Sequence, residues 1–285
     1  MKVKLSDLFG FENKNVVITG AGSGMGYAAT KLLKELGAKV YSTVRRKPLD
    51  FSVEREITVD LSNPNEIDEL VAQLPDEIIA LFVCHGISNT AGNTNSLLVN
   101  LTNFFSFKYL TEKLLPKMAD NGSVTFISST GGRLWRKSIA SCLGVIRCET
   151  WDDAVAWYEN HPQMTKEGYV FAKNCQHVYV MNKVHSPEFI DRKIRLNAIA
   201  PGFTATGLSD DFNRSINNDA EFGKKILEDM FLSPWNGRAA APEEMGYPLV
   251  LVGSAICSYM SGQIIYIDYG CSSAMDFAEL CLPKQ

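Results

Sequence analysis

The chain has 285 residues, which is enough for one large domain with a buried core or for two small ones. Hydrophobic residues make up 46% of it and charged residues 21%, the usual balance of a globular protein. The net charge of −4 argues against a nucleic-acid partner held by a basic field, and no apolar run reaches the about 18 residues that a membrane span needs.

The N-terminus begins with polar sequence, from Met1 to Asp7, and lacks the apolar core of a signal peptide. Seven cysteines are scattered along the chain, and none form a C-x-x-C motif. Their odd number and their position in apolar runs favour reduced thiols in a cytoplasmic protein. Because no repeat or low-complexity linker is visible, we expect a single domain over residues 1–285.

The first structural unit is an expected strand, glycine turn and helix. Residues 15–19 form a short β-branched run typical of a buried parallel strand, glycines follow at 20, 22, 24 and 26, and a helix is expected from Tyr27 to Leu36. Glycines let a pyrophosphate approach the backbone, and the helix N-terminus offers it free N–H groups. Glycine turns are common without ligands, but the flanking strand and helix favour a dinucleotide site.

The second expected strand, 39–44, ends in Arg45 and Arg46 and indicates which dinucleotide would bind. Folds that bind NAD have an acid here to hold the ribose 2′-hydroxyl, whereas folds that bind NADP have an arginine near the 2′-phosphate. Val44 occupies the position where the acid is expected and Arg45 follows it, so NADP is favoured over NAD. The alternative is that both arginines are solvated loop charges.

Strands and helices continue to alternate, with strands expected at 57–61 and 78–84 and helices at 65–74 and 97–118. Asp60 would accept a hydrogen bond from adenine at the end of its strand. His85 has no second ligand at metal-binding spacing, so a structural or cofactor-lining role is favoured and no metal site is expected. Asn100 lies in an apolar stretch, where a buried amide needs hydrogen-bond partners. It is either a helix residue whose amide bonds to neighbouring protein groups or a group that binds a relay water.

Ser128 and Ser129 end an expected strand at 123–129, on the edge where open α/β sheets bind ligands. Tyr169 and Lys173 lie four residues apart on an expected helix at 169–184, so their side chains share one face. An ammonium beside the phenol would lower its pKa from about 10 and suit it to acid–base work on an alcohol or carbonyl. Chance also produces such pairs, as a half-exposed Tyr beside a solvated Lys.

The C-terminal third keeps the same pattern, with a strand at 194–200 followed by Pro201, Gly202, Thr204 and Thr206, a helix at 250–261 and a strand at 263–268. This alternation predicts an α/β fold, a single Rossmann-type doubly wound parallel sheet of about seven strands with helices on both faces.

Taken together, these residues resemble the short-chain dehydrogenase/reductase family over almost the whole chain. Thr19 to Gly26 is similar to the family's T-G-x-x-x-G-x-G, and six motifs match in order. The others are Asp60-Leu61 for its adenine contact, Val99-Asn100-Leu101 for its asparagine segment, Ile127-Ser128-Ser129 for its serine, Tyr169-x-x-x-Lys173 for its catalytic pair, and Asn197 to Gly202 with Ser261 to Gln263 for its later landmarks.

The resemblance implies a role for each matched residue. Tyr169 would exchange a proton with the substrate oxygen, and Ser129 would hydrogen-bond that oxygen. Lys173 would hold the nicotinamide ribose and depress the tyrosine pKa, and Asn100 would anchor a water of the proton relay. The implied cofactor-binding residues are Gly20, Ser23, Gly24, Met25, Gly26, Arg45, Asp60, Leu61, Cys84, His85, Gly86, Tyr169, Lys173, Ile199, Pro201, Gly202, Thr204 and Thr206.

The sequence departs from the family pattern at two points. The usual N-N-A-G is Val83-Cys84-His85-Gly86, which alters the adenine-side wall. The gap from Ser129 to Tyr169 is 40 residues, several times the usual spacing, and gives an insertion at about 133–168. Within it, Thr150 to Asp153 would cap a helix running to about Asn160.

A similar insertion, and a similar C-A-G, occur in the 3α-hydroxysteroid dehydrogenase/carbonyl reductase branch, which implies a hydroxysteroid or bile-acid alcohol and its ketone. Apolar residues compatible with a lid over such a ligand are Phe203, Leu208, Phe212 and the segment Met230 to Trp235, although ordinary core or subunit contacts are the alternative. A homo-oligomer, dimer or tetramer, is also implied.

Two other functions remain open. A carbonyl reductase for smaller aliphatic or aromatic ketones would keep the same chemistry. A non-catalytic dinucleotide-sensing regulator would keep only the fold, and the presence of Asn100, Ser129, Tyr169 and Lys173 argues against it because a regulator has no need of proton-transfer groups.

Overall fold

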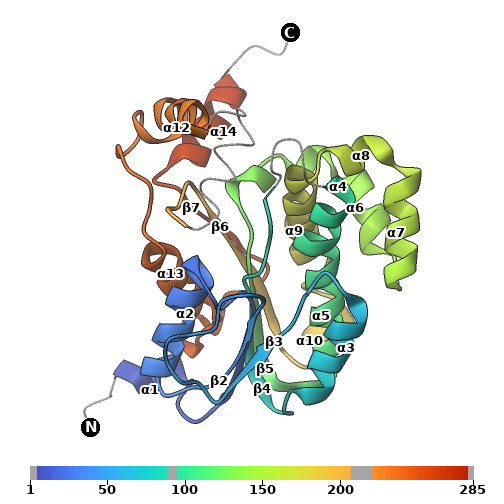
Figure 1. Ribbon diagram of the computed structural model, residues 1–285, viewed down its shortest axis with the longest axis vertical. Coiled ribbons are helices and arrows are strands. Elements are labelled where there is room, and N and C mark those ends of the chain that lie inside the picture. The colour runs from blue at the N-terminus through green and yellow to red at the C-terminus, as the bar shows by residue number, and fades with distance from the viewer. Residues whose placement is uncertain (1–4, 89–94, 207–219, 282–285) are drawn as a thin grey trace.

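A seven-stranded sheet in the order β3-β2-β1-β4-β5-β6-β7 forms the centre of the computed structural model, which describes residues 5–88, 95–206 and 220–281 (Figure 1). All neighbouring strands pair in parallel. The strands are β1 (Asn15–Ile18), β2 (Lys39–Val44), β3 (Arg55–Thr58), β4 (Ile78–Val83), β5 (Met118–Ile127), β6 (Arg195–Pro201) and β7 (Ile264–Ile267). The predicted α/β fold with a doubly wound parallel sheet is confirmed.

Helices cover both faces of the sheet (Figure 1). They are α1 (Leu5–Phe9), α2 (Gly24–Glu35), α3 (Pro64–Gln73), α4 (Ser96–Asn100), α5 (Ser106–Leu114), α6 (Ile139–Ile146), α7 (Trp151–Asn160), α8 (Pro162–Lys166), α9 (Tyr169–Lys183), α10 (Pro187–Ile190), α12 (Ala220–Leu227), α13 (Glu243–Gly253) and α14 (Cys271–Cys281). None of the helices in the described ranges is long and apolar enough to cross a membrane.

The two hydrophobic cores lie on opposite faces because side chains alternate along each strand. In β4, Ala80 and Phe82 join the core under α2 and α13, whereas Leu81 and Val83 join the core under α3, α5 and α9. Burial on both faces explains why the strands read as continuous apolar runs rather than as alternating ones.

The strand order reverses beside β1, which pairs with β2 on one side and with β4 on the other. The chain leaves the two strands toward opposite faces of the sheet, so a crevice opens at their carboxyl ends. This is the edge to which the sequence assigned the glycine turn, Asp60 and the serines.

Residues 133–168 form an ordered helical layer outside α4 and α9 (Figure 1). The expected cap of α7 is present, since Thr150 Oγ1 accepts from Asp153 N while Asp153 accepts from Thr150 N. Trp157 stacks on Phe171 of α9, with ring centroids 5.9 Å apart and planes 7° from parallel. The layer is therefore fastened to the helix that carries Tyr169 and Lys173.

Two expected helices have different bounds. The helix expected at 97–118 is divided into α4, a π-helical turn η1 (Leu101–Phe105), α5 and a 3₁₀ turn (Leu115–Lys117). The helix expected at 250–261 is wrong, because α13 begins at Glu243 and ends at Gly253. Pro248 lies inside α13, and because proline is unfavourable inside a helix, the sequence did not indicate that the helix begins at Glu243. After α13, Ser254 Oγ accepts a hydrogen bond from Ile256 N and caps a separate short turn.

Candidate active site

A cavity of about 730 Å³ opens at the carboxyl edge of the sheet and is of the size that small-molecule sites have. It brings together the predicted Ser129, Tyr169 and Lys173. Its lining also includes the residues predicted for the cofactor, namely Gly20, Ser23, Gly24, Met25, Gly26, Arg45, Asp60, Leu61, Cys84, His85, Gly86, Pro201, Gly202, Thr204 and Thr206. Asn100 and Ile199 were predicted to belong to the site and do not line the cavity.

The glycine turn between β1 and α2 packs too closely against neighbouring backbone to carry side chains at Gly20 and Gly26. Gly20 has φ +68°, and a Cβ there would lie 2.8 Å from the backbone of His85, while a Cβ on Gly26 would lie 2.4 Å from Gly20 O. Ser23 precedes α2 in an extended conformation, and its side chain does not cap the helix. The first N–H groups of α2 thus remain available to an anion, which fits the pyrophosphate of a dinucleotide.

Basic side chains surround the end of β2. Arg45, Arg46 and Lys47 all line the cavity, and Val44 ends the strand. Burial alone would raise the pKa of Asp60, but hydrogen bonds from Ser62 and the charges of Arg45 and Arg46 lower it on balance. Asp60 therefore carries a negative charge at neutral pH and faces a positively charged rim.

His85 is held between two hydroxyls. Its Nδ1 lies 2.8 Å from Thr19 Oγ1 and its Nε2 lies 2.7 Å from Ser106 Oγ. Ser106 donates its own proton to Thr102 O, so His85 must donate from Nε2 and accept at Nδ1. Burial lowers the pKa of His85 to about 3, which keeps the ring neutral. No cluster of three or more potential metal ligands exists within the described ranges.

The structure does not bring the side chain of Asn100, the predicted relay asparagine, into the cavity. Its side chain is buried and donates to Ser96 O at 2.8 Å and to Thr165 O at 2.9 Å, which ties α4 to α8. Asn103 lines the cavity instead, and its amide pairs with both backbone groups of Ile87, at 2.8 Å to N and 2.7 Å to O. The two asparagines are three apart, and the wide π-turn η1 determines which of them faces the cavity.

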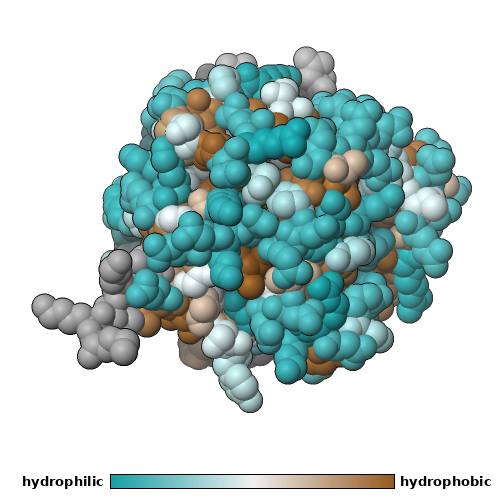
Figure 2. Space-filling model, turned by 90° about the horizontal axis from the view of Figure 1, so that it is seen from below, coloured by the Kyte–Doolittle hydropathy of each residue, from teal (hydrophilic) through white to brown (hydrophobic). Residues whose placement is uncertain are grey.

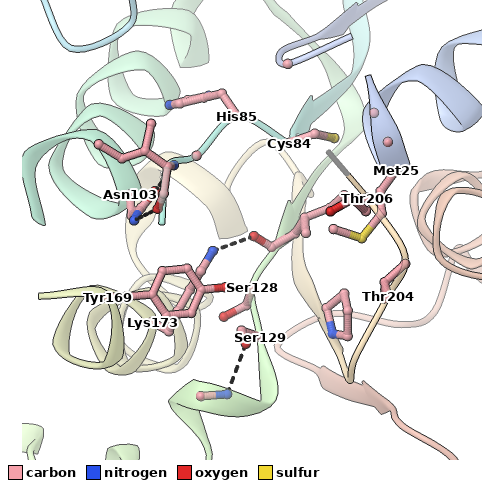
Figure 3. Close-up of a pocket in the computed structure, with 18 of the residues that line it drawn as sticks. Met25, Cys84, His85, Asn103, Ser128, Ser129, Tyr169, Lys173, Thr204 and Thr206 are labelled. Atoms are coloured by element: carbon pink, nitrogen blue, oxygen red, sulfur yellow. Dashed lines mark hydrogen bonds between the residues drawn. The ribbon is translucent and has the colours of Figure 1, made fainter. Parts of the chain in front are cut away.

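Tyr169 begins α9 and lies beside Ser129, which follows β5 (Figure 3). The two hydroxyls form a hydrogen bond. Ser129 Oγ also accepts from Gly131 N at 3.0 Å, which fixes the hydroxyl at the N-terminus of a 3₁₀ turn. Lys173 Nζ lies 5.3 Å from the centre of the Tyr169 ring and donates to Ile127 O at 3.1 Å. The arrangement places a phenol, a hydroxyl and an amine around one point of the cavity.

Burial dominates the ionisation of this group. It raises the pKa of Tyr169 to about 12, although the hydrogen bond with Ser129 opposes part of the rise. It lowers the pKa of Lys173 to about 7. The expected depression of the tyrosine pKa by Lys173 is not seen in this structure, where desolvation of the phenolate dominates and the hydrogen bond with Ser129 opposes it in part.

The C-terminal helix closes the other side of the cavity, which the sequence did not predict. Cys271, Ser272 and Met275 of α14 line it. Arg133, after the serine loop, also lines it and binds α14 through Asp276 Oδ1 at 2.5 Å and Glu279 Oε1 at 2.9 Å. Of the predicted lid, Phe203 lines the cavity, whereas Leu208 and Phe212, and the side chains of Met230 and Phe231, lie outside the described residues.

Two protein-family models match the sequence, one in each half of the chain. Residues 14–141 match a family model described as short chain dehydrogenase, and residues 166–272 match one described as enoyl-(acyl carrier protein) reductase. Coniferyl-alcohol dehydrogenase of Pseudomonas sp. (strain HR199 / DSM 7063) is 30% identical over 207 residues, which cover 70% of this chain and 76% of that protein.

Two hydroxysteroid enzymes are also similar. The 3-alpha-hydroxysteroid dehydrogenase/carbonyl reductase of Comamonas testosteroni is 25% identical over 266 residues, covering 91% of this chain and 97% of that protein. The crystal structure of the 3-alpha-hydroxysteroid dehydrogenase from Pseudomonas sp. B-0831 complexed with NADH matches with a TM-score of 0.73 and 23% identity, over 92% of this chain and 98% of that chain. The structural likeness supports the fold.

Proposed function

We propose that this chain, which belongs to the short-chain dehydrogenase/reductase family of NAD(P)-dependent oxidoreductases acting on CH–OH groups, interconverts a bulky secondary alcohol and its ketone. The observation that carries the proposal is the grouping of Ser129, Tyr169 and Lys173 in one cavity with the glycine turn of α2. A non-catalytic dinucleotide-sensing regulator would have no use for this grouping.

Each of the three side chains has a task that its position supports. Ser129 would donate a hydrogen bond to the substrate oxygen, and Tyr169 would give a proton to that oxygen or take one from it. Lys173 would hold the cofactor ribose beside the phenol. A bound nicotinamide dinucleotide supplies hydride acceptance and donation, and the glycine turn, Asp60 and the β2 tip are the groups that would hold it.

NADP is the proposed cofactor, with NAD as the alternative. Three cations, Arg45, Arg46 and Lys47, line the adenine end of the cavity, and Val44 stands where an acid would be needed to bind the ribose 2′-hydroxyl. Guanidinium groups suit a phosphate, which they bind through paired N–H donors.

A hydroxysteroid or bile acid is the proposed substrate class. Similarity to the Comamonas testosteroni enzyme and the wide cavity closed by Phe203 and Met275 support it. An aromatic alcohol or a smaller ketone is the second candidate, and the similarity to a coniferyl-alcohol dehydrogenase favours it.

The test is absorbance at the reduced-nicotinamide band, with NAD and NADP in parallel, against hydroxysteroids, bile acids, coniferyl alcohol and simple ketones. Position-selective oxidation of a steroid with NADP is the expected result. Turnover of coniferyl alcohol or simple ketones alone would replace the substrate and keep the reaction. Tight cofactor binding without turnover of any compound would favour the regulator.

We also propose a cytoplasmic homo-oligomer, a dimer or a tetramer. The six cysteines whose side chains the structure describes are free thiols, which is compatible with a reducing compartment. Exposed apolar side chains gather on α13 and the turn after it, namely Tyr247, Leu251, Ile256 and Tyr259. The face seen in Figure 2 is covered mostly by hydrophilic residues, with small apolar patches between them. Light scattering of the purified protein would give the assembly mass.

A further inference from the structure

Gln176 makes a buried link beside the lysine of the active site. It follows Lys173 by three residues on α9, so both side chains lie on the same face of the helix. Its Oε1 accepts from Lys173 Nζ at 3.2 Å, and its Nε2 donates to Asn103 O at 2.7 Å. Gln176 and Asn103 are fully buried and Lys173 is 4% exposed.

The chemistry of the partners fixes the orientation of this amide. An ammonium only donates hydrogen bonds and a carbonyl only accepts them. Turning the Gln176 amide over would set its NH₂ against the Lys173 ammonium and its oxygen against the Asn103 carbonyl. Both contacts would then be repulsive, so the assignment follows from the neighbours.

The Asn103 carbonyl lies in the π-turn η1, where the helix widens. Side chains satisfy two consecutive carbonyls in this turn, since Ser106 Oγ donates to Thr102 O at 2.7 Å and Gln176 Nε2 donates to Asn103 O. The turn therefore presents a backbone acceptor, the Asn103 carbonyl, to α9, and Gln176 donates a hydrogen bond to it. A buried carbonyl of this kind needs a partner.

We propose that Gln176 is a positioning residue for the lysine of the proposed dehydrogenase, linking the Lys173 amine to the carbonyl of Asn103 through its amide. The role rests on the proposed function. The resemblance implied that Asn100 anchors a water of the proton relay and assigned no role to Gln176.

The groups around Lys173 give Gln176 its importance. Four titratable side chains face the amine, and at neutral pH none of them carries a negative charge. Burial raises the pKa of Tyr169 to about 12 and also raises the pKa of Cys84, and it lowers the pKa of His85 and of His177 to about 3. The ammonium is therefore stabilised by two neutral acceptors, Gln176 Oε1 and Ile127 O.

The experiment is a pH titration of lysine labelled with ¹³C at Cε, followed by NMR on the whole protein without substrate, with Lys173→Met used to assign the signal. Gln176→Met removes the acceptor at nearly equal volume and lowers the Lys173 pKa by about one. Gln176→Glu offers a carboxylate and raises that pKa. Asn174→Leu is the matched control, a buried amide on α9 whose Nδ2 faces Ser138 rather than Lys173.

Opposite shifts for the two Gln176 variants, with the control unchanged, support the proposal. Equal shifts in both, no shift in either, or the same fall in Asn174→Leu would overturn it. If Gln176→Met does not fold, the rise in Gln176→Glu remains decisive. The readout needs no turnover, so a wild-type protein that is inactive on every alcohol refutes the proposed function and leaves this test intact.

Where turnover is found, the same variants give a second readout. A positioning role predicts a fall in kcat for Gln176→Met of roughly tenfold, with a shifted pH profile and little change in KM for the alcohol. A loss confined to protein stability, with unchanged kcat and pH profile in the folded fraction, would contradict it.

Discussion

At the scale of single residues, the active site is defined by burial of groups that water would normally solvate. Lys173 is 4% exposed, and burial lowers its pKa from the usual 10.5 to about 7. Burying this ammonium lowers the stability of the folded protein, whereas an apolar side chain in the same space would not. A lysine at this position therefore indicates a function.

The stability cost of Lys173 depends on pH in a predictable direction. Its folded pKa is below its unfolded pKa, so the unfolded chain binds more protons between the two values and stability rises with pH there. The slope is about 1.4 kcal/mol for each pH unit between pH 7 and 10.5. The cost is complete below pH 7 and vanishes above pH 10.5.

Lys173→Met should therefore gain most over the wild type at pH 7 and progressively less toward pH 10. Urea unfolding of both proteins across this range measures the difference in the free energy of unfolding. A difference that is constant with pH would show that the lysine is not desolvated as described.

Cofactor choice also belongs to the residue scale. Arg45→Ala should weaken binding of NADP by roughly tenfold to a hundredfold, since a charge-assisted contact to the 2′-phosphate is lost, and should change NAD binding little. Fluorescence titration with each reduced cofactor gives the two constants.

A suitable control for this substitution is Arg55→Ala, because Arg55 contacts Gln73 on α3 and lies outside the cavity. Equal losses for NADP and NAD in Arg45→Ala would remove the assignment of Arg45 to the 2′-phosphate.

At the scale of elements, ion pairs help to hold α14 in the cavity wall. Its residues Cys271, Ser272 and Met275 line the cavity, and Arg133 holds the helix by ion pairs to Asp276 and Glu279. Partly exposed ion pairs of this kind contribute about 0.2–1 kcal/mol each to stability. We therefore expect local opening of α14 to need little free energy.

Arg133→Ala should raise the rate of amide hydrogen exchange in α14 by roughly threefold to tenfold, while α9 keeps its protection. Arg136→Ala is the control, because Arg136 stacks on Trp135 and is in none of the ion pairs that the described residues of α14 form. Unchanged exchange in Arg133→Ala would mean that packing alone holds the helix.

At the scale of the whole molecule, the alternation of strands and helices along the chain could be predicted from the sequence. Buried β-branched runs predicted the strands, and because parallel strands end on one edge, residues as distant as Gly20 and Ser129 were expected to meet there. Within the segment 133–168, the helix α7 was also anticipated through its cap at Thr150.

Features decided by tertiary geometry were not predictable in this way. Asn100 and Asn103 are both amides in an apolar stretch, and Asn103, inside the π-turn η1, is the one that lines the cavity. The pKa of Tyr169 depends on how deeply α9 is covered, which no spacing of Tyr and Lys reports. The wall formed by α14 depends on a fold-back contact with Arg133, about 140 residues away in sequence.

The most direct test of the account is Tyr169→Phe, measured for turnover of the best alcohol by nicotinamide absorbance and for cofactor binding by fluorescence. Loss of the phenol should reduce turnover by about 10²- to 10⁴-fold, because proton transfer to the substrate oxygen is removed, while cofactor affinity stays within about twofold. Tyr109→Phe, whose hydroxyl contacts Asp68 outside the cavity, should match the wild type. Full turnover in Tyr169→Phe would contradict the assignment of Tyr169 as the acid–base group.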